Sequence, residues 1–326
     1  MNNRSLRVGV VMGGPSSEHD ISLLTGRNVL IGLTQTGHNA HPVYIAENGN
    51  WFLGSKRGVA FDPIDICSKF DVMFNATHGE YGEDGRLSQV FEHCRVPFTG
   101  SGVAASALAM NKIISREIFM QAGLRVPRAV PIRADEFDPK KHMSQIHRMS
   151  APPWVVKPAS RGSSVGVSIA QTFQQLEEAI HHAFLYDKQI LVEEYIQGKE
   201  ITCGVLENVN GERHHALHPI EIIPPEGQFF DHQVKYDGST KEMPAPFYGE
   251  MLRQIHSAAV TAHTALGCRH YSRTDMIVKG TKIYVLELNT LPGLTSESLF
   301  PKAARWAKLE LPDLLDHLIQ LAVRTS

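Results

Sequence analysis

The chain has 326 residues, of which 42% are hydrophobic and 20% are charged. This balance is typical of a globular protein with two or three packed units. Its 32 lysines and arginines against 34 aspartates and glutamates give a net charge of −2, which excludes a broad cationic surface for nucleic acid. No stretch approaches the roughly 20 apolar residues that span a bilayer, and the polar N-terminus lacks a signal sequence. We therefore expect a cytoplasmic protein with no membrane or nucleic-acid partner.

The first third alternates short apolar runs with helical patterns, which is typical of a parallel sheet covered by helices. Strands are expected over residues 6–12 and 71–77, and a helix over 85–94. Each strand runs into a loop rich in glycine and acidic residues, 13–20 and 78–85. Ligands of such sheets bind at the carboxyl ends of strands, so both loops are candidate binding segments.

The middle third predicts a small mixed sheet with helices on one side. The elements expected there are a helix through Asn111 and Lys112, the hairpin-like strands 154–157 and 165–169, a helix over 173–184 and a strand over 190–195.

The last third predicts more strands, one long helix and one long polar segment. The expected elements are strands 200–206 and 214–223, a helix over 248–266, and strands 272–278 and 282–288 joined at 279–281. The polar, proline-containing segment 224–247 is too long for a plain connection, and loops of that length are usually functional or disordered.

The cysteines lack metal-ligand spacing, so we expect buried free thiols at Cys67, Cys94, Cys203 and Cys268. The adjacent pairs His181-His182 and His214-His215 have side chains that point in different directions and make poor chelates. We interpret both pairs as surface residues. His78, at a strand end, is the histidine placed where a ligand would bind.

Three oxygen-bearing side chains near the C-terminus suit a metal site. Glu287 and Asn289 are two apart on a predicted strand, so they share one face, and Asp275 lies on the strand predicted to pair with it. Mg²⁺ takes a few protein oxygens and completes its shell with phosphate and water. The alternative is the polar face of an ordinary half-exposed strand.

A second candidate segment is the glycine-serine turn 162–166, which follows Lys157 at the end of a strand. Backbone N–H groups and hydroxyls of such a turn can close over phosphate oxygens while the lysine neutralises charge. A strand follows the turn, so it is not the strand-to-helix phosphate loop, and a simple turn is the alternative.

Other charged residues have two open interpretations. A solvated surface position is the default for Lys112, and a salt-bridged face competes with adenine or ribose binding at Glu193, Glu194 and Glu200. Glu18 follows a glycine turn at the start of an apparent helix, where capping competes with binding of a ligand ammonium.

Together these segments resemble the D-alanine–D-alanine ligases of the ATP-grasp superfamily, and the resemblance runs along almost the whole chain in the family's order. The stretches that carry it are 13–22, 78–85, 99–112, 156–166, 193–200, 235–236, 273–275 and 287–299. It implies an α/β protein of the ATP-grasp fold, with an N-terminal parallel α/β domain followed by two α+β subdomains that clamp ATP. The implied units are 1–101, 102–192 and 193–326, with 224–247 as a lid loop.

The resemblance also implies residue roles. ATP would bind at Lys112, Lys157, Ser164, Glu193, Glu194, Ile196, Glu200 and Lys235. Two Mg²⁺ ions, with Mn²⁺ as an alternative, would be held by Asp275, Glu287 and Asn289. The carboxylate of one D-alanine would attack the γ-phosphate, and the amine of a second would displace phosphate from the acyl phosphate.

The substrate roles follow from the same resemblance. Glu18 would hold the first ammonium, Arg273 would face the developing oxyanion, and Gly293 would leave room at the reacting centre. The carboxylate sites would be formed by His78, Ser298 and Leu299. Tyr236 would close the lid through Ser163, and a tyrosine there goes with an amine nucleophile in this family, whereas phenylalanine goes with D-lactate. The product would serve peptidoglycan synthesis, and the family suggests a homodimer through the first unit.

Three departures from the family pattern put the substrates, more than the reaction, in question. The lid sequence 229–236 is unusual, Thr274 replaces an aliphatic residue, and Asn111 replaces an aspartate. The alternatives are an ATP-grasp ligase for other amino acids and an ATP-binding regulatory relative without catalysis.

Overall fold

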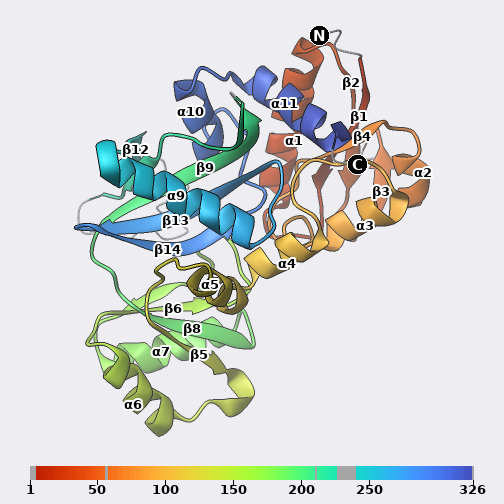
Figure 1. The fold of residues 1–326 in the computed structure, drawn as a ribbon. Helices are drawn as coiled ribbons and strands as arrows, with labels where there is room; N and C mark the ends of the chain where they lie inside the picture. Colours follow the sequence, from red (N-terminus) through yellow and green to blue (C-terminus); the bar gives the residue numbers. More distant parts are fainter. Residues whose placement is uncertain (1–4, 56–57, 210, 226–239, 325–326) are drawn as a thin grey trace.

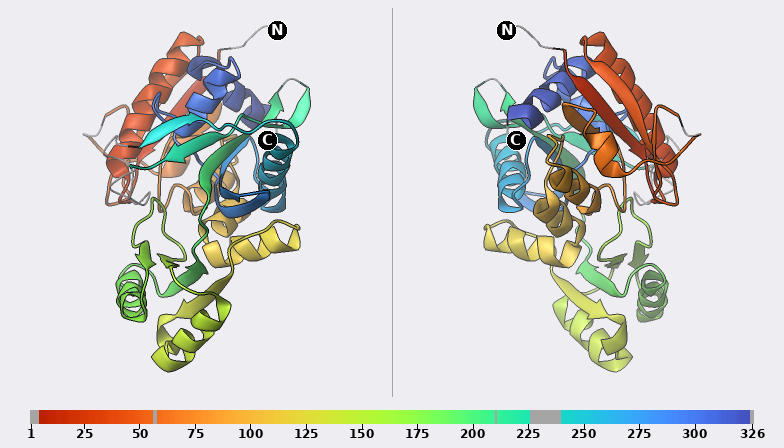
Figure 2. Two further views of the ribbon diagram at one scale, coloured as in Figure 1. Left: turned by 90° about the vertical axis from the view of Figure 1, so that its left-hand side faces the viewer. Right: turned by 90° about the vertical axis from the view of Figure 1, so that its right-hand side faces the viewer.

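Three β-sheets organise the chain in the computed structural model, which describes residues 5–55, 58–209, 211–225 and 240–324. The first and third sheets lie side by side, and the second projects away from them with its helices (Figures 1 and 2). Among the described residues, no helix is long and apolar enough to cross a bilayer.

The first sheet is parallel except at one edge, in the order β3-β2-β1-β4. Its strands are β1 (Arg7–Gly13), β2 (Asn39–Ile45), β3 (Trp51–Leu53) and β4 (Val72–Asn75). Alternate residues of β1 enter separate cores on the two faces, Val8 and Val10 on one and Val11 on the other. The helices of this unit are α1 (His19–Gln35), α2 (Pro63–Cys67) and α3 (Arg86–Cys94). The strands and the helix predicted here are confirmed.

The second sheet is antiparallel throughout, in the order β5-β8-β6-β7, so the predicted mixed sheet is wrong. Its strands are β5 (Ala129–Arg133), β6 (Trp154–Pro158), β7 (Ser168–Ala170) and β8 (Gln189–Glu194). Its helices are the 3₁₀ turn η1 (Ala134–Glu136), α6 (Pro139–Met149) and α7 (Phe173–Phe184). Each α-helix connects two parallel strands that a third, antiparallel strand separates, so no parallel neighbours form. The predicted unit boundary after residue 192 falls within β8.

The third sheet is also antiparallel, with β10 paired to β9 beside the path β12-β11-β9-β13-β14. Its strands are β9 (Lys199–Val209), β10 (Glu212–Ala216), β11 (Ile220–Ile223), β12 (Lys241–Pro244), β13 (Tyr271–Lys279) and β14 (Lys282–Asn289). One face packs on α4 (Val103–Met110), α5 (Lys112–Gln121) and α9 (Gly249–Ala265). The last helices, α10 (Leu299–Trp306) and α11 (Leu311–Arg324), share a core with the first sheet, which joins the two ends of the chain (Figure 1).

Several boundary predictions in this half are wrong for identifiable reasons. The helix through Asn111 is two helices, because Asn111 is extended and its side chain accepts hydrogen bonds from the backbone N–H groups of Ile113 and Ile114. The single strand 214–223 is two strands separated by a segment that includes Pro219, which has no N–H to donate. The segment 224–247 contains the strand β12 before its last three residues, and its residues 226–239 lie outside the described part of the chain.

The cysteines are free, as predicted. Cys67, Cys203 and Cys268 are buried, whereas Cys94 is only partly buried. Burial raises the pKa of the Cys203 thiol to about 12, so this thiol is inert at neutral pH.

Candidate active site

One cavity of about 740 Å³ is lined by residues of all three sheet units. Every predicted site residue in the described ranges lines it: Glu18, His78, Lys112, Lys157, Ser163, Ser164, Glu193, Glu194, Ile196, Glu200, Arg273, Asp275, Glu287, Asn289, Gly293, Ser298 and Leu299. Lys235 and Tyr236 lie outside the described residues. The structure thus brings together segments that are far apart in the sequence.

The oxygen-bearing side chains lie on the adjacent strands β13 and β14. Asp275 is in register with Glu287, and Arg273 with Asn289, so the four side chains share one sheet face. Thr202 Oγ1 donates a hydrogen bond of 2.5 Å to Asp275 Oδ1. Two carboxylates and an amide oxygen in this arrangement fit the hard-oxygen donor set of Mg²⁺.

Arg273 and Asp275 form a two-pronged ion pair, with Nε and Nη2 at 2.9 and 2.8 Å from the two carboxylate oxygens. Burial alone would lower the pKa of Arg273, but the Asp275 carboxylate outweighs it, so that pKa is raised. Arg273 therefore stays a cation at the cavity wall, able to face a developing negative charge.

Two lysines, each paired with a carboxylate, place further positive charge in the cavity. Lys112 Nζ lies 2.9 Å from Glu287 Oε2 and donates to the Arg161 carbonyl at 2.8 Å. Its side chain is 10% exposed, so the surface interpretation of Lys112 is wrong. Lys157 Nζ lies 2.8 Å from Glu193 Oε2, and both side chains are less than a tenth exposed. Such paired lysines suit polyphosphate, which can replace the carboxylates as their partner.

Part of the cavity lining is apolar, and of its residues only Ile196 was predicted. These residues are Pro127, Val155, Ile196, Ile277 and Leu286, which suit a flat aromatic ring. Ile277 follows Asp275 by two residues on β13, so strand alternation could have placed it in the cavity.

Glu194, which also lines the cavity, is held by an ion pair whose partner, Arg128, the sequence did not reveal. Arg128 Nη2 lies 2.7 Å from Glu194 Oε2. Burial alone would raise the pKa of the Glu194 carboxyl, but Arg128 outweighs it and the pKa is lowered.

The glycine-serine segment forms a tight turn beside Glu18. Ser163 and Ser164 have φ of 52° and 57°, and the Val165 N–H donates to the Gly162 carbonyl at 3.2 Å, which are features of a type I′ turn. This turn delays the start of β7 to Ser168 instead of the predicted 165. Two non-glycine residues at positive φ are uncommon and occur often at functional sites.

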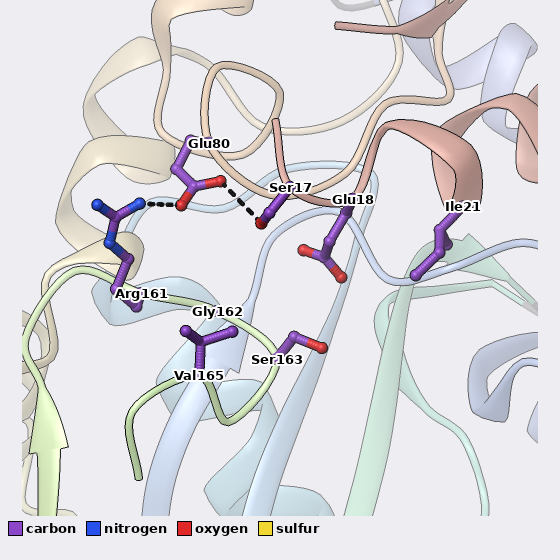
Figure 3. Close-up of a pocket in the computed structure, with 8 residues that line it drawn as sticks. All are labelled: Ser17, Glu18, Ile21, Glu80, Arg161, Gly162, Ser163 and Val165. Carbon is purple, nitrogen blue, oxygen red and sulfur yellow. Dashed lines mark hydrogen bonds and ion pairs between the residues drawn. The ribbon is translucent and has the colours of Figure 1, made fainter. Parts of the chain in front are cut away.

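An ion pair that the sequence did not reveal ties this turn to the first unit. Arg161, directly before Gly162, pairs with Glu80, whose carboxylate also accepts from Ser17 Oγ (Figure 3). In the same view, Glu18 and Ser163 approach each other across the cavity from α1 and from the turn. The pair Glu80–Arg161 therefore fixes how closely Glu18 faces the turn.

The remaining predicted residues cluster at the start of α10. A Cβ on Gly293 would lie 2.9 Å from Ser298 Oγ and 3.8 Å from His78 Cε1. His78 Nε2 lies 2.8 Å from Thr25 Oγ1, which fixes the ring. Ser298 stands at the N-cap of α10, where backbone N–H groups favour a ligand carboxylate.

The cavity lies between a parallel-sheet unit and two antiparallel sheets. It holds cationic side chains suited to bind phosphate and oxygen atoms suited to bind a metal ion. This combination defines a nucleotide-dependent ligase of the ATP-grasp class. Residues 7–66 and 56–101 match the family model described as D-ala D-ala ligase N-terminus, and residues 118–320 match D-ala D-ala ligase C-terminus. The chain belongs to the D-alanine–D-alanine ligase family. This confirms the predicted family and fold class.

Relatives of known name cover nearly the whole chain. The D-alanine–D-alanine ligase of Syntrophobacter fumaroxidans is 39% identical over 99% of both chains. That of Geobacter sulfurreducens is 38% identical over 97% of this chain and 94% of its own.

Solved structures agree with these sequence matches. The Bacillus anthracis D-alanine–D-alanine ligase complexed with ATP has a TM-score of 0.81 at 30% identity, with 98% of each chain covered. The VanG D-Ala:D-Ser ligase of Enterococcus faecalis has a TM-score of 0.85 at 30% identity, with 98% of this chain and 100% of its own covered.

Proposed function

We propose that this protein joins two D-alanine molecules to D-alanyl-D-alanine with conversion of ATP to ADP and phosphate, for the synthesis of peptidoglycan precursors. The observation that carries this function is that Lys112, Lys157 and Arg273 line the same cavity as Glu18 and His78. Side chains suited to bind phosphate and side chains suited to bind an amino acid therefore lie in the same cavity, where the two ligands can react.

The first step is attack of a D-alanine carboxylate oxygen on the γ-phosphorus, which forms an acyl phosphate and releases ADP. Lys112 and Lys157 exchange their carboxylate partners for phosphate oxygens, and Arg273 faces the charge that develops during transfer. Two Mg²⁺ ions held by Asp275, Glu287 and Asn289 would neutralise phosphate charge. Apolar residues of the cavity lining, among them Ile277 and Leu286, receive the adenine ring.

The second step is attack of the amine of another D-alanine on the acyl carbon, which expels phosphate and loses a proton. Glu18 holds the ammonium of the first D-alanine, and His78 lies beside its carboxylate. The N-terminus of α10, with Ser298 and Leu299, receives the carboxylate of the second molecule. Gly293 leaves space between these groups.

The direct test measures ADP and dipeptide together with purified protein, ATP, Mg²⁺ and D-alanine. We expect ADP release only when D-alanine is present, with one dipeptide formed for each ADP. The Glu287→Gln variant, which removes a proposed metal ligand, should lose both products. ADP release without any dipeptide, or an unaffected Glu287→Gln variant, would contradict the proposal.

The alternative is that the second subsite accepts an amino acid other than D-alanine, and a specific observation favours it. The D-Ala:D-Ser ligase of Enterococcus faecalis resembles this chain at a TM-score of 0.85, and the predicted lid sequence is unusual. Competition between D-alanine and D-serine, with the products resolved by mass, distinguishes the two. A mixed product rich in D-alanyl-D-serine would support the alternative.

Two further proposals concern the state of the protein in the cell. We propose a cytoplasmic homodimer that associates through the first unit. Light scattering of the purified chain tests the dimer, and cell fractionation tests the compartment. A monomer across the working concentration range would contradict the first proposal.

A further inference from the structure

A second cluster of ligand-type side chains lies away from the active site. Glu207 is near the end of β9, His214 is in β10 and His263 is in the last turn of α9. Glu207 and His214 are directly opposite each other in the β9–β10 pairing, so their side chains share a face. That face packs on α9, which brings in His263.

The cluster is on the opposite side of the third sheet from the active site. Arg273 and Asp275 of β13 face the cavity. Ser272, the residue directly before Arg273, contacts His263 instead, with 2.8 Å between Ser272 Oγ and His263 Nδ1. Successive residues of a strand point to opposite faces. The two sites are therefore separated by the sheet itself.

The distances between the donor atoms match a metal site better than direct hydrogen bonds. Glu207 Oε1 lies 3.5 Å from His214 Nε2 and 3.5 Å from His263 Nε2. This exceeds the roughly 2.7–3.2 Å of a normal N–H···O hydrogen bond. A tetrahedral Zn²⁺ with bonds of about 2.0–2.1 Å holds its ligand atoms about 3.4 Å apart. All three donors lie within 4.8 Å of one another, so small side-chain rotations complete the triangle.

His263 supplies an independent reason for a cation here. Its side chain is fully buried and its Nε2 has no hydrogen-bond partner. When Nδ1 donates to Ser272 Oγ, Nε2 presents a lone pair toward the Glu207 carboxylate, and two acceptors then face each other. In that tautomer, a metal ion between Nε2 and Oε1 would remove the repulsion. Such an arrangement, with the second ring nitrogen hydrogen-bonded, is usual for metal-binding histidines.

Glu207 is held in the orientation that a ligand needs. Its Oε2 accepts from the His270 backbone N–H at 2.7 Å, and its carbonyl lies 2.7 Å from His317 Nε2. Oε1 is left to face the two histidines. The side chains of His214 and Glu207 are 16% and 13% exposed, so the position between them can be reached from solvent. His214 is thus only partly exposed, less so than a surface position would imply.

We propose that Glu207, His214 and His263 bind one Zn²⁺ ion, with water as the fourth ligand. Two imidazoles and one carboxylate suit Zn²⁺ among the divalent ions, whereas Mg²⁺ prefers oxygen ligands alone. The ion would tie the β9–β10 hairpin to the end of α9 and stabilise the third sheet. It takes no part in the ligase reaction, and its existence does not depend on the proposed function.

The test is Zn²⁺ binding to the metal-stripped full chain in competition with a chromophoric chelator. Excess Mg²⁺ throughout the titration occupies the proposed active-site ligands. Co²⁺ gives a second readout, because tetrahedral Co²⁺ absorbs strongly in the visible range. We expect one Zn²⁺ per chain, and His214→Asn and Glu207→Gln should each weaken binding at least about tenfold.

Two control variants separate this site from other binding. His215 is the next residue of β10, points to the other face and pairs with Glu212 at 2.7 Å, so His215→Asn should bind Zn²⁺ like the parent. Glu287→Gln should also bind it normally. If the parent binds no Zn²⁺ above the Mg²⁺ background, or His214→Asn binds as tightly as the parent, the proposal is wrong. Retained ligase turnover in His214→Asn shows that this variant is folded.

Discussion

The pair Lys157–Glu193 allows a structural role to be separated from a role in ATP binding. The perturbation is Lys157→Met, which keeps the length of the side chain and removes its charge. The partner Glu193 is 6% exposed and would be left as a buried carboxylate without its cation. A double variant, Lys157→Met with Glu193→Gln, removes both charges.

The expected magnitude follows from the geometry of the pair. At the 2.8 Å separation of Nζ and Oε2 and an effective dielectric constant of about 20, the Coulomb attraction is about 6 kcal/mol. Desolvation of both groups offsets part of this, and removal of one partner of a buried pair costs about 3–5 kcal/mol. We expect that loss for Lys157→Met, and recovery of most of it in the double variant.

The double variant should recover most of the lost stability but not the lost activity. A charge-assisted contact to phosphate contributes about 1.5–3 kcal/mol, so kcat/KM for ATP should fall about 10- to 100-fold in both variants. Urea unfolding gives the stability, and ADP release with D-alanine gives the rate. If the double variant recovers ATP turnover together with stability, Lys157 does not contact phosphate and its role is structural only.

Two further predictions concern segments of the first unit. Glu80→Gln should raise the KM for D-alanine by up to about fivefold with little change in kcat, because a partly exposed pair such as Glu80–Arg161 contributes at most about 1 kcal/mol. The double variant with Arg161→Gln should be no worse than either single variant in steady-state kinetics, and additive effects would contradict the link. Asp84 has a lowered pKa, since Arg86 and the backbone N–H groups of Tyr81 and Arg86 outweigh the effect of burial. Its contribution to stability is complete above the unfolded-state pKa of 3.8 and is lost as the pH falls below that value. Asp84→Asn should flatten this acid dependence in unfolding curves measured at a series of pH values, and an unchanged slope would refute the assignment.

The sequence predicts elements well where a periodic pattern is long. The strand 6–12, the helix 85–94 and the helix 248–266 are all present, because each buries a face with a regular repeat. The errors arise where a single residue determines a helix boundary or where a strand distant in sequence determines the order of a sheet. Asn111 caps a new helix inside a continuous helical pattern, and the antiparallel order of the second sheet depends on which strand inserts between two others.

The same distinction between local patterns and long-range contacts applies to the residues of the candidate site. Asp275, Glu287 and Asn289 are recognisable because strand alternation places them on one face. Arg128 and Arg161 were missed, since their pairs with Glu194 and Glu80 join residues 66 and 81 positions apart. The cluster of Glu207, His214 and His263 was missed for the same reason, because three elements must pack before its atoms meet.

The ion pairs in the cavity also explain how one site can accept both polyphosphate and a metal ion. Glu287 faces Lys112, and Asp275 faces Arg273, so each proposed metal ligand lies beside a cation that would repel a bare divalent ion. Lys157 faces Glu193, a carboxylate that would repel bare polyphosphate. With ATP and a metal ion bound together, Lys112 would turn to phosphate and Glu287 would be released to the metal, so neither of these two charges would lose its partner. By reciprocal linkage, Mg²⁺ strengthens ATP binding by the factor by which ATP strengthens Mg²⁺ binding. The paired cavity would therefore favour the ATP–metal complex over either component alone.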